Sequence, residues 1–263
     1  MALRSARSLR HEYELFLEQE IENYKESIPR SAILAIGDEA AAKIASEPQF
    51  ALTELLLLEE VDRIIASRLR LPKYDTWRRK RLKLHDELRR PEHWGLSSSD
   101  ALVRTISGDS ARAGGGGHVL VAGDAARRSA LYLAANGCDV TAVESEGETV
   151  QRVMEAAIQA GLAERVHAVT GALSEFHPEV PLHAVVCSHA ALNSLTVRER
   201  ARVIAVLQSA TLDGGVHLVE TIAAGSSAVD ELRETYAGWQ ISIETASGNE
   251  QVFLARKDGR VTH

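Results

Sequence analysis

Short β-rich runs alternate with helical patterns along the second half of the chain, and this alternation limits the possible folds more than any other feature. The β-rich runs are His118–Ala122, Val140–Glu144, Val166–Thr170, Ala184–Cys187 and Val216–Thr221. Between and after them lie the helical patterns Arg127–Asn136, Glu148–Ala160, Thr196–Ser209 and Ser227–Tyr236. Strands that alternate with helices of about ten residues predict βαβ units and a parallel sheet covered by helices on both faces.

The end of the chain departs from this alternation. Two further β-rich runs, Trp239–Thr245 and Gln251–Arg256, are separated by a short link that contains Ser247, Gly248 and Asn249. A link of this length and composition predicts an antiparallel hairpin. We therefore expect a mostly parallel, Rossmann-like sheet of seven strands that closes with an antiparallel pair.

The first 107 residues have helical spacing and no β-rich runs, which predicts an all-α N-terminal region. Pro29 and Pro72 interrupt the helical patterns, and Ser31 and Asp75 are candidate N-caps for the helices that follow them. The region 108–117 contains four consecutive glycines, which disfavour regular structure. The sequence thus predicts a helical domain at 1–107, a glycine-rich linker at 108–117 and a Rossmann-like domain at 118–263.

Charge and cysteine content exclude several classes of protein. The formal net charge of −7 argues against general binding to nucleic acid or anionic membranes. The two cysteines, Cys138 and Cys187, offer neither a disulfide framework nor metal-ligand spacing, and no metal is expected. The longest apolar run, 130–135, is too short to cross a bilayer, and no apolar segment follows the basic N-terminus. We therefore expect a soluble, cytoplasmic protein.

Several sequence segments of the second half resemble motifs of the class I S-adenosylmethionine (SAM)-dependent methyltransferases. The stretch 118–129 corresponds to the strand and glycine-rich turn of the family's first motif, although only Gly123 is retained, with Ala125 and Arg127 at the other two glycine positions. The sequence of residues 130–144 is similar to that of the tellurite-resistance type of methyltransferase. Leu212-Asp213-Gly214-Gly215 resembles the turn before the family's fifth strand. The resemblance covers roughly residues 117–257.

This resemblance implies SAM as cofactor and assigns a set of residues to its site. Glu144 ends the second strand, where the family's acidic residue binds the ribose hydroxyls of SAM, and a carboxylate there faces the ligand crevice of such a sheet. The remaining expected cofactor-binding positions are Gly123, Asp124, Ala125, Ser145, Gly171, Ala172, Leu173 and Ser188.

Candidates for catalysis and acceptor binding follow the fourth and fifth strands. His189 is a candidate general base because its unperturbed pKa lies near neutrality, and the alternative is a partly exposed loop histidine. Asn193 and the pair Glu220 and Thr221 are expected near the acceptor, with a role at the edge of the core as the alternative. In the N-terminal region, the aromatic residues Tyr74, Trp77 and Trp94 are candidates for a lid, with ordinary packing as the alternative.

Three functions are compatible with these features. The first is a SAM-dependent methyltransferase with a small-molecule acceptor, in which the N-terminal helices provide a lid, an acceptor pocket or a homodimer contact. The alternative is a catalytically inactive methyltransferase-fold protein with a binding or regulatory role, which the incomplete glycine motif favours. The third is an RNA methyltransferase that uses the basic helix at 73–90, although the negative net charge argues against nucleic acid as a partner.

Overall fold

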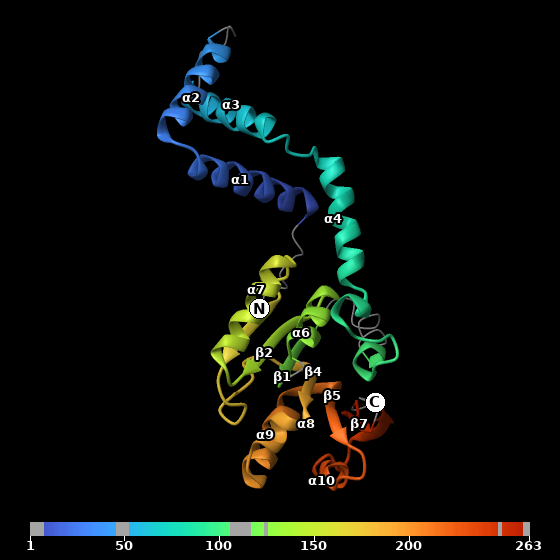
Figure 1. Cartoon of the computed structure of the whole chain (residues 1–263). Helices are drawn as coiled ribbons and strands as arrows, with labels where there is room; N and C mark the ends of the chain where they lie inside the picture. Colours follow the sequence, from blue (N-terminus) through green and yellow to red (C-terminus); the bar gives the residue numbers. More distant parts are fainter. Residues whose placement is uncertain (1–7, 46–52, 106–116, 124–125, 247–248, 260–263) are drawn as a thin grey trace. The chain divides into compact units, whose positions relative to one another are not determined.

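The computed structural model describes residues 8–45, 53–105, 117–123, 126–246 and 249–259 (Figure 1). They belong to two compact units, Met1–Leu84 and His85–His263. The expected linker at 108–117 lies outside the described residues except for Gly117. None of the described helices combines the length and the apolar character needed to cross a membrane.

The first unit is helical, as the sequence predicts. Its helices are α1 (Leu9–Ser27), α2 (Arg30–Ile44), α3 (Thr53–Arg68) and the larger part of α4 (Tyr74–Leu88). The expected caps differ. The N-cap of α2 is Pro29 rather than Ser31, and α4 begins at Tyr74, so that Asp75 lies in its first turn. An acidic residue there still complements the positive end of the helix dipole.

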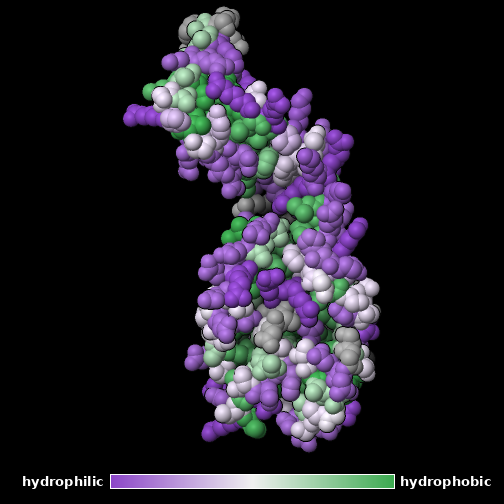
Figure 2. All heavy atoms as spheres, viewed as in Figure 1, coloured by the Kyte–Doolittle hydropathy of each residue, from purple (hydrophilic) through white to green (hydrophobic). Residues whose placement is uncertain are grey.

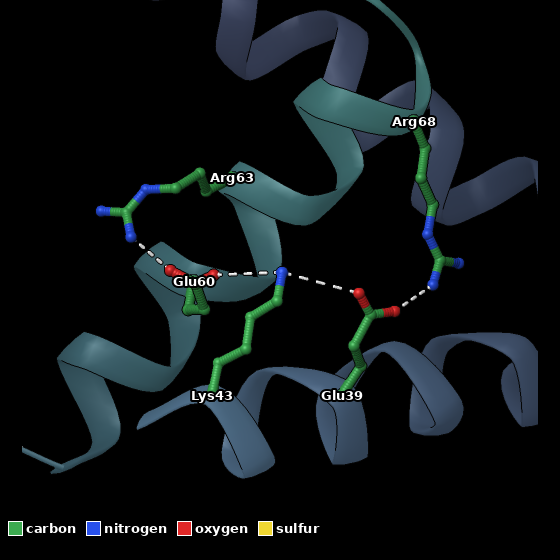
Figure 3. A network of polar contacts seen from close by, with 5 residues as sticks. All are labelled: Glu39, Lys43, Glu60, Arg63 and Arg68. Atoms are coloured by element: carbon green, nitrogen blue, oxygen red, sulfur yellow. Dashed lines mark hydrogen bonds and ion pairs between the residues drawn. The ribbon is translucent and has the colours of Figure 1, made fainter. Parts of the chain in front are cut away.

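The core of the first unit is small. Its buried residues come from α1, α2 and α3 and are Ile21, Ile36, Ala40, Ile64 and Ile65. Figure 3 shows a chain of ion pairs joining α2 and α3: Lys43 lies 3.6 Å from carboxylate oxygens of both Glu39 and Glu60, which also pair with Arg68 and Arg63. Apolar burial and surface charge therefore both link these two helices.

The second unit is built on a seven-stranded sheet with the order β3-β2-β1-β4-β5-β7-β6. The first five strands are parallel, whereas β7 runs antiparallel to its neighbours β5 and β6. The expected fold class is confirmed. The strands are β1 (His118–Ala122), β2 (Asp139–Glu144), β3 (Val166–Thr170), β4 (Leu182–Ser188), β5 (Thr211–Ala223), β6 (Gln240–Thr245) and β7 (Glu250–Arg256).

Helices and two apolar clusters accompany this sheet. Helices α6 (Ala126–Ala135) and α7 (Gly147–Gln159) pack on β1, β2 and β3, and α8 (His189–Asn193) and α9 (Val197–Ala210) pack on β4 and β5. The 3-10 helix η1 (Pro91–Trp94) packs on α6, and α10 (Ala228–Thr235) follows β5. Buried residues from the segment 96–103 join the α6 side of the core, so this segment is part of the second unit.

The connection that follows β3 leaves part of the sheet exposed. The chain passes from β3 to β4 without an intervening helix, through turns at 171–181. Val169 in β3 is accordingly 43% exposed, and a cavity of about 660 Å³ lies against β2 and β3 beneath the 171–182 loop. Of the described helices, α6 and α7 contact β3.

A buried histidine links β5 to α10. His217 lies 2.7 Å from the hydroxyls of both Thr211 and Tyr236. Because the Thr211 hydroxyl donates to the carbonyl of Leu207, it accepts from His217 Nε2–H, and the Tyr236 hydroxyl donates to His217 Nδ1. Burial, assisted by the positive charge of Lys257, lowers the pKa of His217 to about 3. The neutral imidazole is thus fully hydrogen-bonded within the core.

Candidate functional site

The carboxyl ends of the parallel strands define the candidate site. In open α/β sheets, ligands bind beyond these ends where the strand order reverses, and here the order reverses between β1 and β4. Gly123 follows β1, and Ser188 ends β4. These two residues therefore stand at the topological switch point.

Gly123 and Ser188 are in close contact. A Cβ atom on Gly123 would overlap the Ser188 hydroxyl and would lie 3.0 Å from the Ala191 Cβ, and Gly123 has a φ of +94°. Glycine is thus required by both the backbone and the packing. The buried Ser188 hydroxyl accepts a hydrogen bond of 3.2 Å from the Ala191 amide and caps α8. Asp124 and Ala125, the next two expected cofactor ligands, lie outside the described residues.

Glu144 lies beside this contact. Ala122 pairs in register with Val143, so that Glu144 is the position of β2 next to Gly123. The Glu144 side chain is half-buried, with Oε1 enclosed. The backbone carbonyl of Glu144 accepts a 2.9 Å hydrogen bond from the Gly171 amide. Of the other expected ligands nearby, Ser145 and Ala172 are exposed and Leu173 is buried. The structure therefore brings Gly123, Glu144, Gly171 and Ser188 to one edge of the sheet.

The end of β5 adds a second carboxylate to this edge. Glu220 pairs in register with Ser188. Burial raises the pKa of Glu220, the nearby Arg128 lowers it, and Asp100 raises it. Thr221 has a φ of 60°, and the pairing of β5 with β7 is irregular between Val219 and Ile222. Such strain and bulges occur frequently at functional sites, where they redirect side chains.

His189 lies on a different side of α8. With Leu192 it lines a cavity of about 380 Å³ between α8, α9 and α10, whose described lining includes no residue of β1, β2 or β3. Burial lowers the pKa of His189, the positive charge of Arg200 lowers it further, and Glu231 raises it. Ser188 and Ala191, by contrast, contact Gly123. Asn193, at the end of α8, is exposed.

The aromatic candidates for a lid have packing partners within their own units. Tyr74 and Trp77 lie 5.4 Å from the ring of Tyr13, and Trp77 lies 6.0 Å from Phe16. In the second unit, Trp94 donates a 2.7 Å hydrogen bond to the Leu88 carbonyl and packs against the core cluster that includes α6. These contacts agree with ordinary packing, and a role in a lid stays a prediction.

Sequence reasoning did not identify several polar residues near these candidates. Asp100 and Arg128 act on Glu220, and Arg200 and Glu231 flank His189. Arg200 and Glu231 are 31 positions apart, and no local pattern indicates that two separate helices bring them together. The described residues contain no group of three or more His, Cys, Asp or Glu side chains suited to a metal ion.

Comparison with known proteins gives similarity at the level of structure only. No protein-family model and no curated protein matches the sequence. One similar solved structure is the glycopeptide N-methyltransferase MtfA with (S)-adenosyl-L-homocysteine, at 16% identity and a TM-score of 0.48 over 59% of this chain and 87% of that one. TehB from Haemophilus influenzae is 17% identical, with a TM-score of 0.47 over 59% and 62% of the two chains.

A SAM-dependent methyltransferase from Clostridium acetobutylicum is 8% identical, with a TM-score of 0.49 over 59% of this chain and 90% of that one. At such values we draw no functional conclusion from these similarities. The order and direction of the strands themselves establish the fold of the second unit. It is a Rossmann-like sheet in which the antiparallel strand β7 lies between β5 and β6.

Proposed function

We propose that the chain is a SAM-dependent methyltransferase with a small-molecule acceptor, and that SAM binds beyond the carboxyl ends of β1 and β2. The observation that carries the proposal is the position of Glu144, half-buried beside Gly123 at the switch point of the sheet. A carboxylate there can accept two hydrogen bonds from a ribose diol. The resemblance of residues 117–257 to class I methyltransferases supports the same assignment.

Backbone amides and Glu144 are the groups at this edge that can contact such a ligand. The space beside the Gly123 Cα is filled by Ser188, so this glycine serves the packing of β1 against β4. Ligand contacts at the turn would therefore come from backbone amides rather than from space left by missing side chains. Glu144 would bind the ribose, and Gly171, whose amide is bonded to the Glu144 carbonyl, would keep the end of β3 next to it.

Bound SAM supplies a methyl group on an activated sulfonium, so catalysis depends mainly on the position of the acceptor. Glu220 is the candidate to orient the acceptor and take up its proton, because it pairs with Ser188 and its pKa is raised by burial. A raised pKa makes a carboxylate a better proton acceptor. His189, the general base expected from the sequence, lines the cavity on the other side of α8, and we therefore favour Glu220 for this role.

Calorimetric titration of the full chain with SAM and with S-adenosylhomocysteine tests the proposal. We expect Glu144→Ala to weaken SAM binding by about 1.5–3 kcal/mol, roughly 10- to 150-fold, because it removes hydrogen bonds to a charged group. Glu146→Gln is the matched control, since Glu146 is exposed and its side chain does not cap α7. No binding at millimolar SAM, or equal affinity of wild type and Glu144→Ala, would overturn the proposal.

A catalytically inactive methyltransferase-fold protein is the second candidate. It is favoured by Ala125 and Arg127 at positions where the first motif has glycine, and by the packing role of Gly123. The Glu220→Gln variant separates the two candidates. In an enzyme it should lower the rate of methyl transfer at least about tenfold, since general bases contribute roughly 100-fold or more, while SAM affinity stays unchanged. SAM binding without transfer to any of a broad set of amines and hydroxyl compounds would favour the inactive protein.

A further inference from the structure

A second cavity lies outside the crevice proposed for the cofactor. It has a volume of about 380 Å³, is open to solvent on one side and is lined by residues of α8, α9 and α10, which can be followed in Figure 1. Leu192, Ile204 and Leu232, one from each helix, are almost completely buried and form part of its apolar lining. The cavity is large enough for a ligand of the size of a free amino acid, and its lining favours a ligand with an apolar part.

An arginine with unused hydrogen-bonding capacity lies in the wall of this cavity. The Arg200 side chain is only 18% exposed, and its ion pair with Glu231 joins Nη1 and Oε2 at 3.4 Å. A guanidinium has five N–H donors, and the described residues provide this one long contact. A charge held this far from water is stabilised when further acceptors complete its hydrogen bonds. Arg200 is thus poised to bind a carboxylate.

The acidic residues beside Arg200 limit what that carboxylate can belong to. Glu231 and Glu234 both line the cavity. The Glu231 side chain is 55% exposed and accepts a 3.1 Å hydrogen bond from the Ser227 hydroxyl. A simple anion would bind Arg200 but would be repelled by the two glutamates, and a simple cation would be repelled by Arg200. A ligand that carries both charges on neighbouring atoms satisfies both partners.

We propose that this cavity binds a free α-amino acid with an apolar side chain, with its carboxylate on Arg200, its ammonium group on Glu231 and its side chain on the apolar lining. His189 lies at the same wall and, as a neutral imidazole, can donate one further hydrogen bond to the carboxylate. This site is distinct from the cofactor crevice. Ser188 and Ala191 of α8 contact Gly123, whereas His189 and Leu192 line the cavity.

Isothermal titration of the full chain with three matched ligands tests the proposal. L-leucine carries both charges, 4-methylpentanoate lacks the ammonium group, and 3-methylbutylamine lacks the carboxylate. We expect L-leucine to bind and 4-methylpentanoate to bind more weakly, because it loses a pair with the half-exposed Glu231. We expect 3-methylbutylamine to bind at least about tenfold more weakly, because it leaves the shielded Arg200 without its carboxylate partner. Absence of L-leucine binding at millimolar concentration, or equal binding of either analogue, would overturn the proposal.

Variants locate the site. Arg200→Met should weaken L-leucine binding at least about tenfold, since it removes a charged partner. The matched control is Arg198→Met, because Arg198 lies on the same helix and is exposed. If Arg200→Met fails to fold, Ala201→Phe provides a second variant, which narrows the cavity and leaves Arg200 and Glu231 in place.

Retention of L-leucine binding in both Arg200→Met and Ala201→Phe would place the ligand elsewhere and overturn the assignment. The result does not depend on the cofactor proposal. SAM affinity is measured in a separate titration and should be the same in the wild type, Arg200→Met and Ala201→Phe. If L-leucine competed directly with SAM, the two sites would be one, which would also contradict the proposal.

Discussion

Among the described residues, the first unit buries five apolar side chains between α1, α2 and α3, whereas the second unit has an extensive apolar cluster on each side of its sheet. Large apolar side chains also remain on the surface of the first unit: Leu34 and Leu55 are 60% exposed and Leu58 is 54% exposed. Figure 2 shows the corresponding mixture of apolar and strongly polar surface. Since burial of apolar surface is the main stabilising term, most of the stability should reside in the second unit.

The ion-pair network of the first unit and the histidine hydrogen bonds of the second unit also differ in burial: the former lies at the surface, and the latter lie in the core. In the first unit, the network of Lys43, Glu39 and Glu60 lies at the surface, where ion pairs contribute little (Figure 3). In the second unit, the hydrogen bonds of His217 are buried, so losing one partner leaves an unsatisfied polar group. Polar contacts at the surface and in the core therefore have very different energetic consequences, and the following predictions test this contrast.

The largest expected effect is that of Phe253→Ala in β7. Phe253 is fully buried and packs in the cluster that contains Tyr236 and Ile222. Truncation should cost about 3–5 kcal/mol of unfolding free energy, because it removes buried surface and leaves a cavity. Urea denaturation followed by hydrogen exchange and mass spectrometry should show reduced protection across β4, β5 and β7.

Ile65→Ala is the matched change in the first unit, where Ile65 is also fully buried. It should cost about 2–5 kcal/mol of the local stability of α2 and α3. If the units are separate cooperative bodies, each variant lowers hydrogen-exchange protection in its own unit only. Loss of protection in both units from either change would show that the chain unfolds as one body.

Acid should destabilise the second unit through His217. Its pKa is lowered from 6.5 to about 3 in the folded state, so the unfolded state takes up the proton first as the pH falls. Stability is therefore complete above about pH 6.5 and decreases between pH 6.5 and 3. At pH 4.5 the loss should be about 3 kcal/mol, measured by urea denaturation with Trp239 fluorescence as the probe.

His217→Gln supplies the control for this pH dependence. The variant is less stable at pH 7.5, but its unfolding free energy should change less between pH 7.5 and 4.5 than that of the wild type, because the titrating group is gone. An identical pH dependence in both proteins would show that other groups cause the acid sensitivity.

The hydrophobic pattern of the sequence predicted the strands in their order of appearance, although β5 begins at Thr211 and not at the predicted Val216. The runs His118–Ala122 and Val166–Thr170 match β1 and β3 in full, because short β-rich segments between turn residues have few alternatives. The Thr196 to Glu199 capping box likewise fixes the start of α9. Helix α8 was not predicted, because five residues are too few to show a helical period.

The candidate site was predictable only in part. Glu144 is located by its position at the end of a strand, which depends on local sequence. Two features depend on how distant segments pack. One is the contact of Gly123 with Ser188, and the other is that His189 faces a cavity on the side of α8 away from Gly123. The same holds for Arg200 and Glu231, whose ion pair joins two helices across an intervening strand. Which distant segments lie next to a strand end is set by tertiary packing, and no local pattern along the chain encodes it.

The smallest expected effect concerns the ion pairs of the first unit. Glu60 is the most shielded member of the network, since its side chain is 12% exposed, and it pairs with both Lys43 and Arg63. We expect Glu60→Gln to cost no more than about 1 kcal/mol in 0.1 M salt, because surface pairs gain little over hydration. The coupling between Glu60→Gln and Lys43→Met, measured by a double-mutant cycle, should decrease further in 1 M salt, where the Debye length is about 3 Å.

A coupling of more than about 2 kcal/mol that persists in 1 M salt would contradict this expectation. It would mean that the network behaves like a buried one, as the low exposure of Glu60 alone could suggest. The partners decide between these outcomes: the side chains of Lys43 and Arg63 are 54% and 71% exposed, so water and salt reach the cationic half of each pair. Because screening at one partner is enough to weaken an ion pair, the first unit should depend on its few buried isoleucines rather than on its charges.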